Sequence, residues 1–294
     1  MTAATQLRSW MFCPGDKQRF LDKSEVSGTD VVMFDLEDGV IWSQKPEARL
    51  MVKEQLKKTP WNGPLRYVRV NAPSTGLTAE DIMTVASAGL DGICLTKVES
   101  PEDVVHAAGI LEAAEIERGI PKGQIRILAA IESANSLFQA QSIAKAHERV
   151  IGIIFGAEDY ALDIGYPANR VAEASELLHA RSIIVNAAAS ARVLSVDGVF
   201  PNLNDPDGLH ADALQARRLG FTSKSTFNPR QIEMLNKQFS PTEEEIAYAR
   251  KVAEAFKEAE ARGDASVAVG GQLVDLPIVM RAIRLLEAAE NTQS

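Results

Sequence analysis

Arg126-Ile-Leu-Ala-Ala-Ile-Glu-Ser-Ala-Asn135 and Val150-Ile-Gly-Ile-Ile-Phe-Gly-Ala-Glu-Asp159 are the two stretches of the sequence that decide its fold. Each contains an apolar run without helical periodicity, and each ends in a carboxylate. Such runs are typical of parallel strands that are buried on both faces. Parallel strands bring their carboxyl ends to one rim, where α/β folds carry their chemistry. We therefore expect Glu132 and Asp159 to lie close together.

The same pattern of a strand followed by a helix recurs along the chain. The further strands are expected at residues 8–13, 30–34, 65–71, 92–97, 193–200 and 222–227. Eight strands that alternate with helices over roughly 230 residues predict an α/β fold, a (β/α)₈ TIM barrel. An open doubly wound sheet is the alternative, and it is disfavoured because no Gly-x-Gly-x-x-Gly follows any strand.

Two of the intervening helices carry start signals. Thr78-x-x-Asp81 resembles a capping box for a helix over residues 78–88. Ser100 followed by Pro101 and Asp103 predicts another helix start, with serine as the cap and proline in the first turn.

The C-terminal part of the sequence differs from the rest. Ser240-Pro-Thr-Glu243 begins an amphipathic helix that ends at Gly263, a polar segment follows, and a final helix is expected over residues 277–289. We therefore expect two domains. Residues 1–239 form the catalytic barrel, and residues 240–294 form a C-terminal helical extension able to cover an active site or reach a neighbouring subunit.

Composition narrows the class of protein. Hydrophobic residues make up 46% of the chain and charged residues 24%, as in a globular protein with a sizeable core. The net charge of −9 argues against nucleic acid or an anionic membrane as partner. No apolar run approaches the roughly 18 residues of a membrane span. Because Cys13 and Cys94 fall inside expected strands and no signal peptide is evident, we predict reduced, buried thiols and a cytoplasmic location.

Glu132 and Asp159 have no His or Cys beside them, which favours a hard divalent cation such as Mg²⁺. The alternative is that each acid caps the helix after its strand. Asp35, Glu37 and Asp38 place three more acids at the end of the second strand. Five acids cannot all bind one Mg²⁺, so we expect some of them to support the ligands or to pair with arginine.

Arg69 lies within the third strand, in Tyr-Val-Arg-Val-Asn71. An arginine that points into a barrel needs a partner, which would be one of these acids or a substrate carboxylate bound through two hydrogen bonds. Lys97 ends the fourth strand and could bind the same anion or be a surface lysine.

Arg8, Lys17 and Arg19 form a basic group around Pro14-Gly15, near the expected rim. A phosphorylated ligand could bind there. A solvated helix face explains the same residues equally well.

Six motifs that occur in order resemble one known family. They are Arg8-Ser-x-Met-Phe-x-Pro-Gly15, Asp35-Leu-Glu-Asp-Gly-Val40, Val68-Arg-Val-Asn71, Lys97-Val-Glu-Ser-Pro101, Ile131-Glu-Ser133 and Gly156-Ala-Glu-Asp159. The sequence is similar to the citrate lyase β-subunit-like family of CoA-ester lyases, within the metal-dependent aldolase/citrate lyase group. The resemblance extends to Gly271-Gln-Leu-Val-Asp-Leu-Pro277. One departure is Asn228, where many relatives have histidine.

The resemblance implies Mg²⁺ bound by Glu132 and Asp159, and Arg69 binding the oxo acid and its developing charge. It implies a homotrimer or a dimer of trimers in which Asp275 is donated across the interface as catalytic acid/base. We include Glu37 and Asp38 among the candidate catalytic residues.

The implied substrates are 3-hydroxyacyl-CoA thioesters such as malyl-CoA or citramalyl-CoA, which would make the protein a carbon–carbon lyase. Arg8, Lys17, Arg19, Arg69 and Glu132 are then the candidate substrate-binding residues, the basic group contacting the phosphates of CoA. Three alternatives stay open. They are a β subunit that acts on a carrier-bound citryl thioester within a citrate lyase complex, a malyl-CoA thioesterase, and a CoA-independent 2-oxo-acid aldolase.

Overall fold

Eight parallel strands close into a barrel in chain order in a computed structural model that describes residues 6–166 and 174–293. The strands are β1 Ser9–Pro14, β2 Val31–Asp35, β3 Leu65–Val70, β4 Gly92–Leu95, β5 Arg126–Ile131, β6 Val150–Phe155, β7 Leu194–Asp197 and β8 Ser223–Thr226. β1 pairs with both β2 and β8, which closes the sheet. The predicted (β/α)₈ barrel is therefore confirmed. The expected seventh strand was too long, since β7 ends at Asp197.

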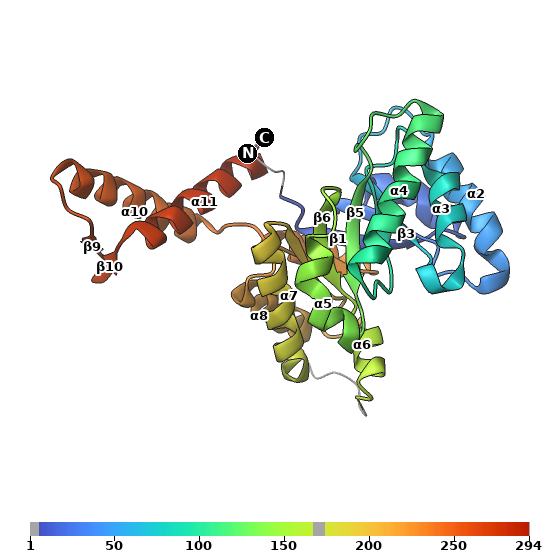
Figure 1. Cartoon of the computed structure of the whole chain (residues 1–294). Coiled ribbons are helices and arrows are strands. Elements are labelled where there is room, and N and C mark those ends of the chain that lie inside the picture. Colours follow the sequence, from blue (N-terminus) through green and yellow to red (C-terminus); the bar gives the residue numbers. More distant parts are fainter. Residues whose placement is uncertain (1–5, 167–173, 294) are drawn as a thin grey trace. The chain divides into compact units, whose positions relative to one another are not determined.

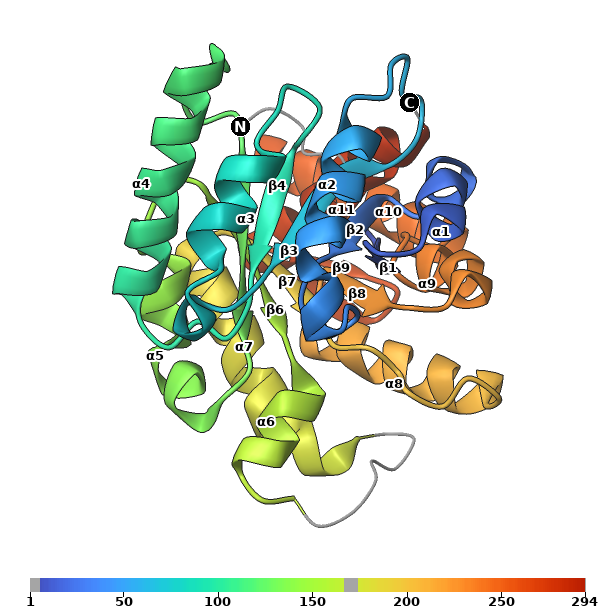
Figure 2. The ribbon, with the colours of Figure 1, turned by 90° about the vertical axis from the view of Figure 1, so that its right-hand side faces the viewer.

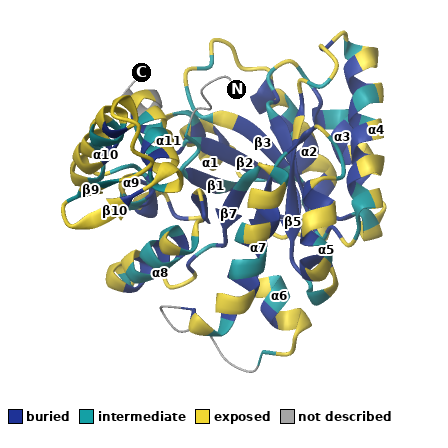
Figure 3. Ribbon diagram, turned by 60° about the vertical axis from the view of Figure 1, so that its left-hand side comes forward, coloured by how far each residue is buried: buried dark blue, intermediate teal, exposed yellow. Residues whose placement is uncertain are grey.

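Helices surround the strands on the outside of the barrel (Figures 1 and 2). They are α1 Gln18–Lys23, α2 Lys45–Leu56, α3 Thr78–Val85, α4 Pro101–Arg118, α5 Ala134–Ala144, α6 Ala157–Asp163, α7 Leu178–Ala191 and α8 Pro206–Leu219. Figure 3 shows buried strands and helices with exposed outer faces. This distribution explains why most of the strands, such as β2, β5 and β6, are rich in apolar residues while the helices carry most of the charge.

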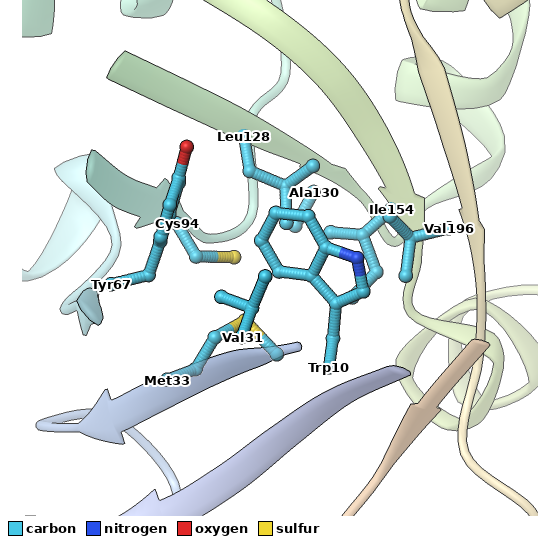
Figure 4. Packing of buried hydrophobic residues seen from close by; sticks show 9 residues of the cluster. All are labelled: Trp10, Val31, Met33, Tyr67, Cys94, Leu128, Ala130, Ile154 and Val196. Atoms are coloured by element: carbon cyan, nitrogen blue, oxygen red, sulfur yellow. The ribbon is translucent and has the colours of Figure 1, made fainter. Parts of the chain in front are cut away.

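The interior of the barrel is filled by side chains from β1 to β7 (Figure 4). Trp10 lies at the centre of this cluster, and its ring meets that of Tyr67 edge-on, with the ring centroids 5.1 Å apart. Gly92 makes room for this pair, because a Cβ on it would stand 2.2 Å from the Tyr67 ring. The filled interior confines any ligand to the ends of the strands.

The two helix-start predictions have different outcomes. Ser100 begins α4 as expected, and the Asp103 carboxylate accepts the Ser100 N–H. The helix expected at Thr78 also forms, as α3, but the capping box predicted for it is wrong. The Thr78 hydroxyl donates to the carbonyl of Asn71, and Asp81 instead accepts hydrogen bonds from Asn71 and Arg49. Both side chains of the expected box are used to fix the segment that follows β3.

The chain divides into two compact units, one over residues 7–236 and a second that includes residues 237–293. The boundary lies inside α9, Ile232–Gln238. The second unit contains α10 Glu243–Ala261, the antiparallel strands β9 Val267–Val269 and β10 Gln272–Val274, and α11 Leu276–Gln293. Its own apolar cluster joins α10 to α11. Within the described residues, no helix is long and apolar enough to cross a membrane.

The sequence predicted both long helices of the second unit but not the hairpin between them. Its strands are three residues long, too short for a period of two to be recognised. Gly270 and Gly271 both have positive φ and form the turn.

Candidate metal and substrate site

A cavity of about 950 Å³ opens at the carboxyl ends of the strands. Its lining comes from β1 to β6 and from β8, and includes Asp35, Arg69, Glu132 and Asp159. The structure therefore brings together the acids of the two stretches that decide the fold and the arginine of β3. Glu37 contacts Arg69 of this lining and Lys97 contacts Asp159, while Asp38 contacts Lys97.

Glu132 directly follows β5 and is buried. Its Oε2 accepts the backbone N–H of Lys97 at 2.7 Å. Among the described residues, its Oε1 accepts no hydrogen bond. Burial raises the pKa of Glu132 to about 7, and the charge of Asp159 adds to the effect. Ser133, not Glu132, caps α5, so the alternative reading of this acid as a helix cap is wrong.

Asp159 lies in the first turn of α6, and its side chain is 35% exposed. It lines the same cavity as Glu132, and α6 has no side-chain cap. Two carboxylates that line one cavity fit a hard cation such as Mg²⁺, which uses one or two protein carboxylates and fills its octahedron with water and substrate oxygens. In the part of the chain that the structure describes, no cluster of three or more His, Cys, Asp or Glu residues could hold a metal. A site for Mg²⁺ would therefore rest on this pair.

Arg69 is held by the acids that follow β2, as its place in the third strand predicted. Its Nε and one Nη donate to the two oxygens of Asp35 at 2.7 and 2.6 Å, and its other Nη lies 3.2 Å from Glu37. Its guanidinium also stacks over the ring of Phe12 at 4.6 Å. Burial opposes the charge on Arg69, but Asp35 and Glu37 raise its pKa, so it stays a cation.

Asp35 anchors the segment that carries these acids. It accepts the backbone N–H groups of Glu37 and Gly39 in addition to Arg69. Burial alone would raise the pKa of Asp35, but Arg69 and the backbone donors hold it below its usual value. Gly39 is required here because a Cβ would stand 2.2 Å from Asp35 Oδ2.

Lys97 was expected either to bind an anion or to be a surface lysine. In the structure, its ammonium group lies among three acids. Its Nζ lies 2.6 Å from Glu37, 3.4 Å from Asp38 and 3.8 Å from Asp159. Burial opposes its charge, but these acids raise the pKa of Lys97 overall. Lys97 thus connects the acids around Arg69 with those of the proposed metal pair.

The expectation that Arg8 joins Lys17 and Arg19 at the rim is wrong. Arg8 precedes β1 and pairs with Asp30, which precedes β2, at the amino ends of the strands. The six residues of β1 separate it from the rim by about 20 Å. Lys17 pairs with Asp16, and Arg19 is exposed on α1. The sequence reading missed Lys23, which lies one helical turn beyond Arg19 and lines the cavity.

Asn228, noted above as a departure from the family pattern, is buried after β8, and its side chain accepts the N–H of Arg230. Asp275 lies in the second unit, exposed between β10 and α11, and its backbone carbonyl accepts the N–H groups of Ile278 and Val279. Both free cysteines are buried, as predicted.

Comparisons with known proteins extend over most of the chain. A family model described as HpcH/HpaI aldolase/citrate lyase matches residues 8–229. The chain is 40% identical over 282 residues to citrate lyase subunit beta of Leuconostoc mesenteroides subsp. cremoris, covering 96% of this chain and 93% of that protein. It is 32% identical over 289 residues to a (3S)-malyl-CoA thioesterase of Cereibacter sphaeroides, covering 98% and 96% of the two chains.

Among solved structures, the chain is similar to protein CitE from Mycobacterium tuberculosis in complex with magnesium, acetoacetate and coenzyme A. The TM-score is 0.79 at 30% identity, and the match covers 98% of this chain and 99% of that one. The similarity therefore includes the second unit as well as the barrel.

Proposed function

This chain belongs to the HpcH/HpaI aldolase/citrate lyase family and is a lyase, and we propose that it is a Mg²⁺-dependent enzyme acting on a 3-hydroxyacyl-CoA thioester. The reaction cleaves or forms a carbon–carbon bond between a thioester such as acetyl-CoA and a 2-oxo acid. Malyl-CoA and citramalyl-CoA are substrates of this kind.

The observation that carries the proposal is the meeting of Glu132, Asp159 and Arg69 in one cavity at the strand ends. Glu132 and Asp159 would hold the Mg²⁺, through carboxylate oxygens that suit this ion. Bound there, Mg²⁺ supplies Lewis-acid stabilisation to the oxygen on the carbon that becomes the oxo group. The related CitE structure binds magnesium, acetoacetate and coenzyme A, which supports the same ligands for this chain.

Arg69 provides a fixed positive charge for the oxo acid. A guanidinium has five N–H donors, of which Asp35 and Glu37 engage three. At least two donors remain for the carboxylate of the oxo acid and for its developing oxyanion. Because Asp35 and Glu37 hold the guanidinium before substrate arrives, the charge needs no reorganisation during the reaction.

Cleavage leaves an enolate of the thioester that must be protonated at carbon. Asp35 and Glu37 are engaged by Arg69 and Lys97, and Glu132 and Asp159 are assigned to the metal. The resemblance to the CoA-ester lyases implies that the residue at Asp275 is donated across a subunit interface, and on that ground we assign the proton transfer to Asp275 of a neighbouring subunit in a homotrimer or dimer of trimers. Its exposed position between β10 and α11 makes it available to another chain.

The pantetheine chain of the CoA thioester would lie in the part of the cavity next to β1 and α1. Phe20, Val26 and Phe227 line the cavity and are exposed, as suits an apolar pantetheine chain. Lys23 lines the same part of the cavity, and Lys17 and Arg19 precede it on the same segment. These three cations are our candidates for the phosphates of CoA.

One observation favours a second candidate. The relative with 40% identity is a citrate lyase subunit beta, so the thioester could be carried by a partner protein of a citrate lyase complex. The same type of bond is broken in that case, and the barrel site serves either carrier.

The test is an assay of the purified chain on malyl-CoA, citramalyl-CoA and citryl-CoA, with Mg²⁺ and then with EDTA. Free CoA and 2-oxo acid are measured separately. We expect Mg²⁺-dependent formation of the 2-oxo acid. Free CoA without an oxo acid would identify a thioesterase, and activity on a carrier-bound citryl thioester alone would identify the β subunit. Cleavage of free hydroxy acids would identify the CoA-independent aldolase.

A further inference from the structure

Lys97 has an unusual backbone conformation and serves two groups of acids at once. Its φ is +48°, in the left-handed region that side chains other than glycine rarely adopt. In this conformation its N–H donates to Glu132 Oε2, while its ammonium group contacts Glu37 Oε1 at 2.6 Å. The ammonium also lies 3.8 Å from Asp159. The residue therefore contacts both proposed metal ligands and Glu37.

The acid that Lys97 holds could otherwise bind a metal. Glu37 is buried, and its other oxygen accepts the N–H of Asp38 and lies 3.2 Å from Arg69. Its Oε1 has the Lys97 ammonium as its partner. Without the Lys97 ammonium, Oε1 of this buried carboxylate would lose its cationic partner, and we expect it to turn to a nearby divalent cation, since a buried polar atom left without a partner is costly.

A third carboxylate would change what the metal can do. Two carboxylates balance the charge of Mg²⁺ and leave four of its six positions for water and substrate oxygens. A third would make the complex anionic and take a further position. Both changes weaken the ion as a Lewis acid toward a substrate oxygen.

We propose that Lys97 is a positioning residue that keeps Glu37 out of the metal coordination, so that Glu132 and Asp159 are the carboxylates that bind the ion. The inference rests on the metal site of the proposed function. The Lys97 ammonium group is the cation that pairs with Glu37. The Lys97 backbone N–H holds Oε2 of Glu132, so that Oε1 faces the ion. Because the ammonium stands beside Asp159, it also keeps the affinity for the divalent ion moderate.

The test uses Mn²⁺ as the probe, with the full-length chain. Lys97→Gly retains the N–H to Glu132, accepts the positive φ without strain and removes the side chain with its ammonium group. Lys97→Arg is the matched control, since it retains the charge. The dissociation constant is measured from the free Mn²⁺ signal in electron paramagnetic resonance, and the number of bound waters from water-proton relaxation.

We expect Lys97→Gly to bind Mn²⁺ at least about tenfold more tightly, with fewer bound waters, because one repelling charge is lost and one carboxylate is gained. Lys97→Arg should resemble the wild type. Adding Glu37→Gln to Lys97→Gly should restore the wild-type water number. Equal or weaker binding in Lys97→Gly, or an unchanged water number, overturns the inference.

The metal site itself is tested separately. Glu132→Gln should abolish Mn²⁺ binding in the wild-type background. Retained binding in Glu132→Gln counts against the proposed function, whereas lost binding there together with unchanged binding in Lys97→Gly counts against Lys97 alone. Thermal unfolding of each variant confirms that the chain is folded.

Discussion

Gly156 lies against Glu132 so closely that a Cβ at residue 156 would stand 2.3 Å from Glu132 Oε1. Gly156 lies between β6 and α6, and Glu132 follows the neighbouring strand β5. The absence of a side chain at one strand end thus makes space for the carboxylate at the next. The oxygen involved is the one that is available to a metal ion.

The first prediction concerns this contact. Gly156→Ala should displace the Glu132 carboxylate and reduce Mg²⁺-dependent turnover by more than about 100-fold, since changes even in outer partners of a metal site typically cost 10–100-fold. Mn²⁺ binding should weaken in parallel. Gly109→Ala is the control, because a Cβ there meets nothing within 4 Å, and it should leave activity unchanged. Normal Mn²⁺ binding in Gly156→Ala would contradict the close contact.

The metal ligands give the second prediction. Glu132→Ala or Asp159→Ala should abolish Mg²⁺-dependent turnover while the fold stays intact, because each change removes one of the two carboxylates proposed to bind the ion. Turnover and far-ultraviolet circular dichroism are measured on the same preparations. Full activity in either variant would rule out the pair as the metal site.

Arg69 gives the third prediction. Arg69→Lys retains the charge but cannot engage both oxygens of Asp35 and present further donors to the substrate. We expect kcat/KM to fall by about 10²–10³-fold, as when one donor to an oxyanion is lost. Mn²⁺ affinity should stay within a few-fold of the wild type. A wild-type kcat/KM would show that a point charge suffices there.

Asp275 gives the fourth prediction. Asp275→Asn should slow exchange of the acetyl-CoA methyl protons with solvent by about 10²–10⁴-fold, the usual contribution of general acid/base catalysis. Metal binding should not change. Glu258→Gln, which alters an exposed acid of α10, is the control. Undiminished exchange in Asp275→Asn would remove this residue from the proton transfer.

The fifth prediction concerns stability at the opposite end of the barrel. Glu115 is buried against Arg149, with N···O distances of 2.7 and 2.5 Å, and accepts the N–H groups of Gly123 and Ile125. Burial would raise the pKa of Glu115, but these donors hold it below its usual value of 4.5. The stabilisation is therefore fully present above about pH 4.5 and is lost as the pH falls through the folded-state pKa.

Glu115→Gln should cost about 3 kcal/mol of unfolding free energy at pH 7, as expected for the loss of one partner of a buried pair. The difference from wild type should narrow below pH 4.5, where Glu115 becomes protonated in the unfolded wild-type chain. Urea unfolding at several pH values measures it. A difference that is constant down to pH 3 would show that the ion pair is not its source.

The site was predicted in part, and the failures have identifiable causes. Glu132, Asp159 and Arg69 were placed correctly at one rim because strand order and parallel direction fix which residues end there. Arg8 was misplaced because closeness in sequence to Lys17 was taken as closeness in space, although a full strand lies between them. The hairpin at Gly270-Gly271 gave too short a signal to be recognised.

The sequence by itself determined the barrel, the rim that carries the acids and the family to which the chain belongs. These follow from local periodicity and from motifs that are contiguous in the chain. The tertiary structure decided that the Lys97 N–H binds Glu132, that its ammonium binds Glu37, and that Gly156 makes room for Glu132. Glu132 and Glu37 lie 35 and 60 residues from Lys97, so these contacts depend on the closure of the barrel and on one backbone angle that no local pattern encodes.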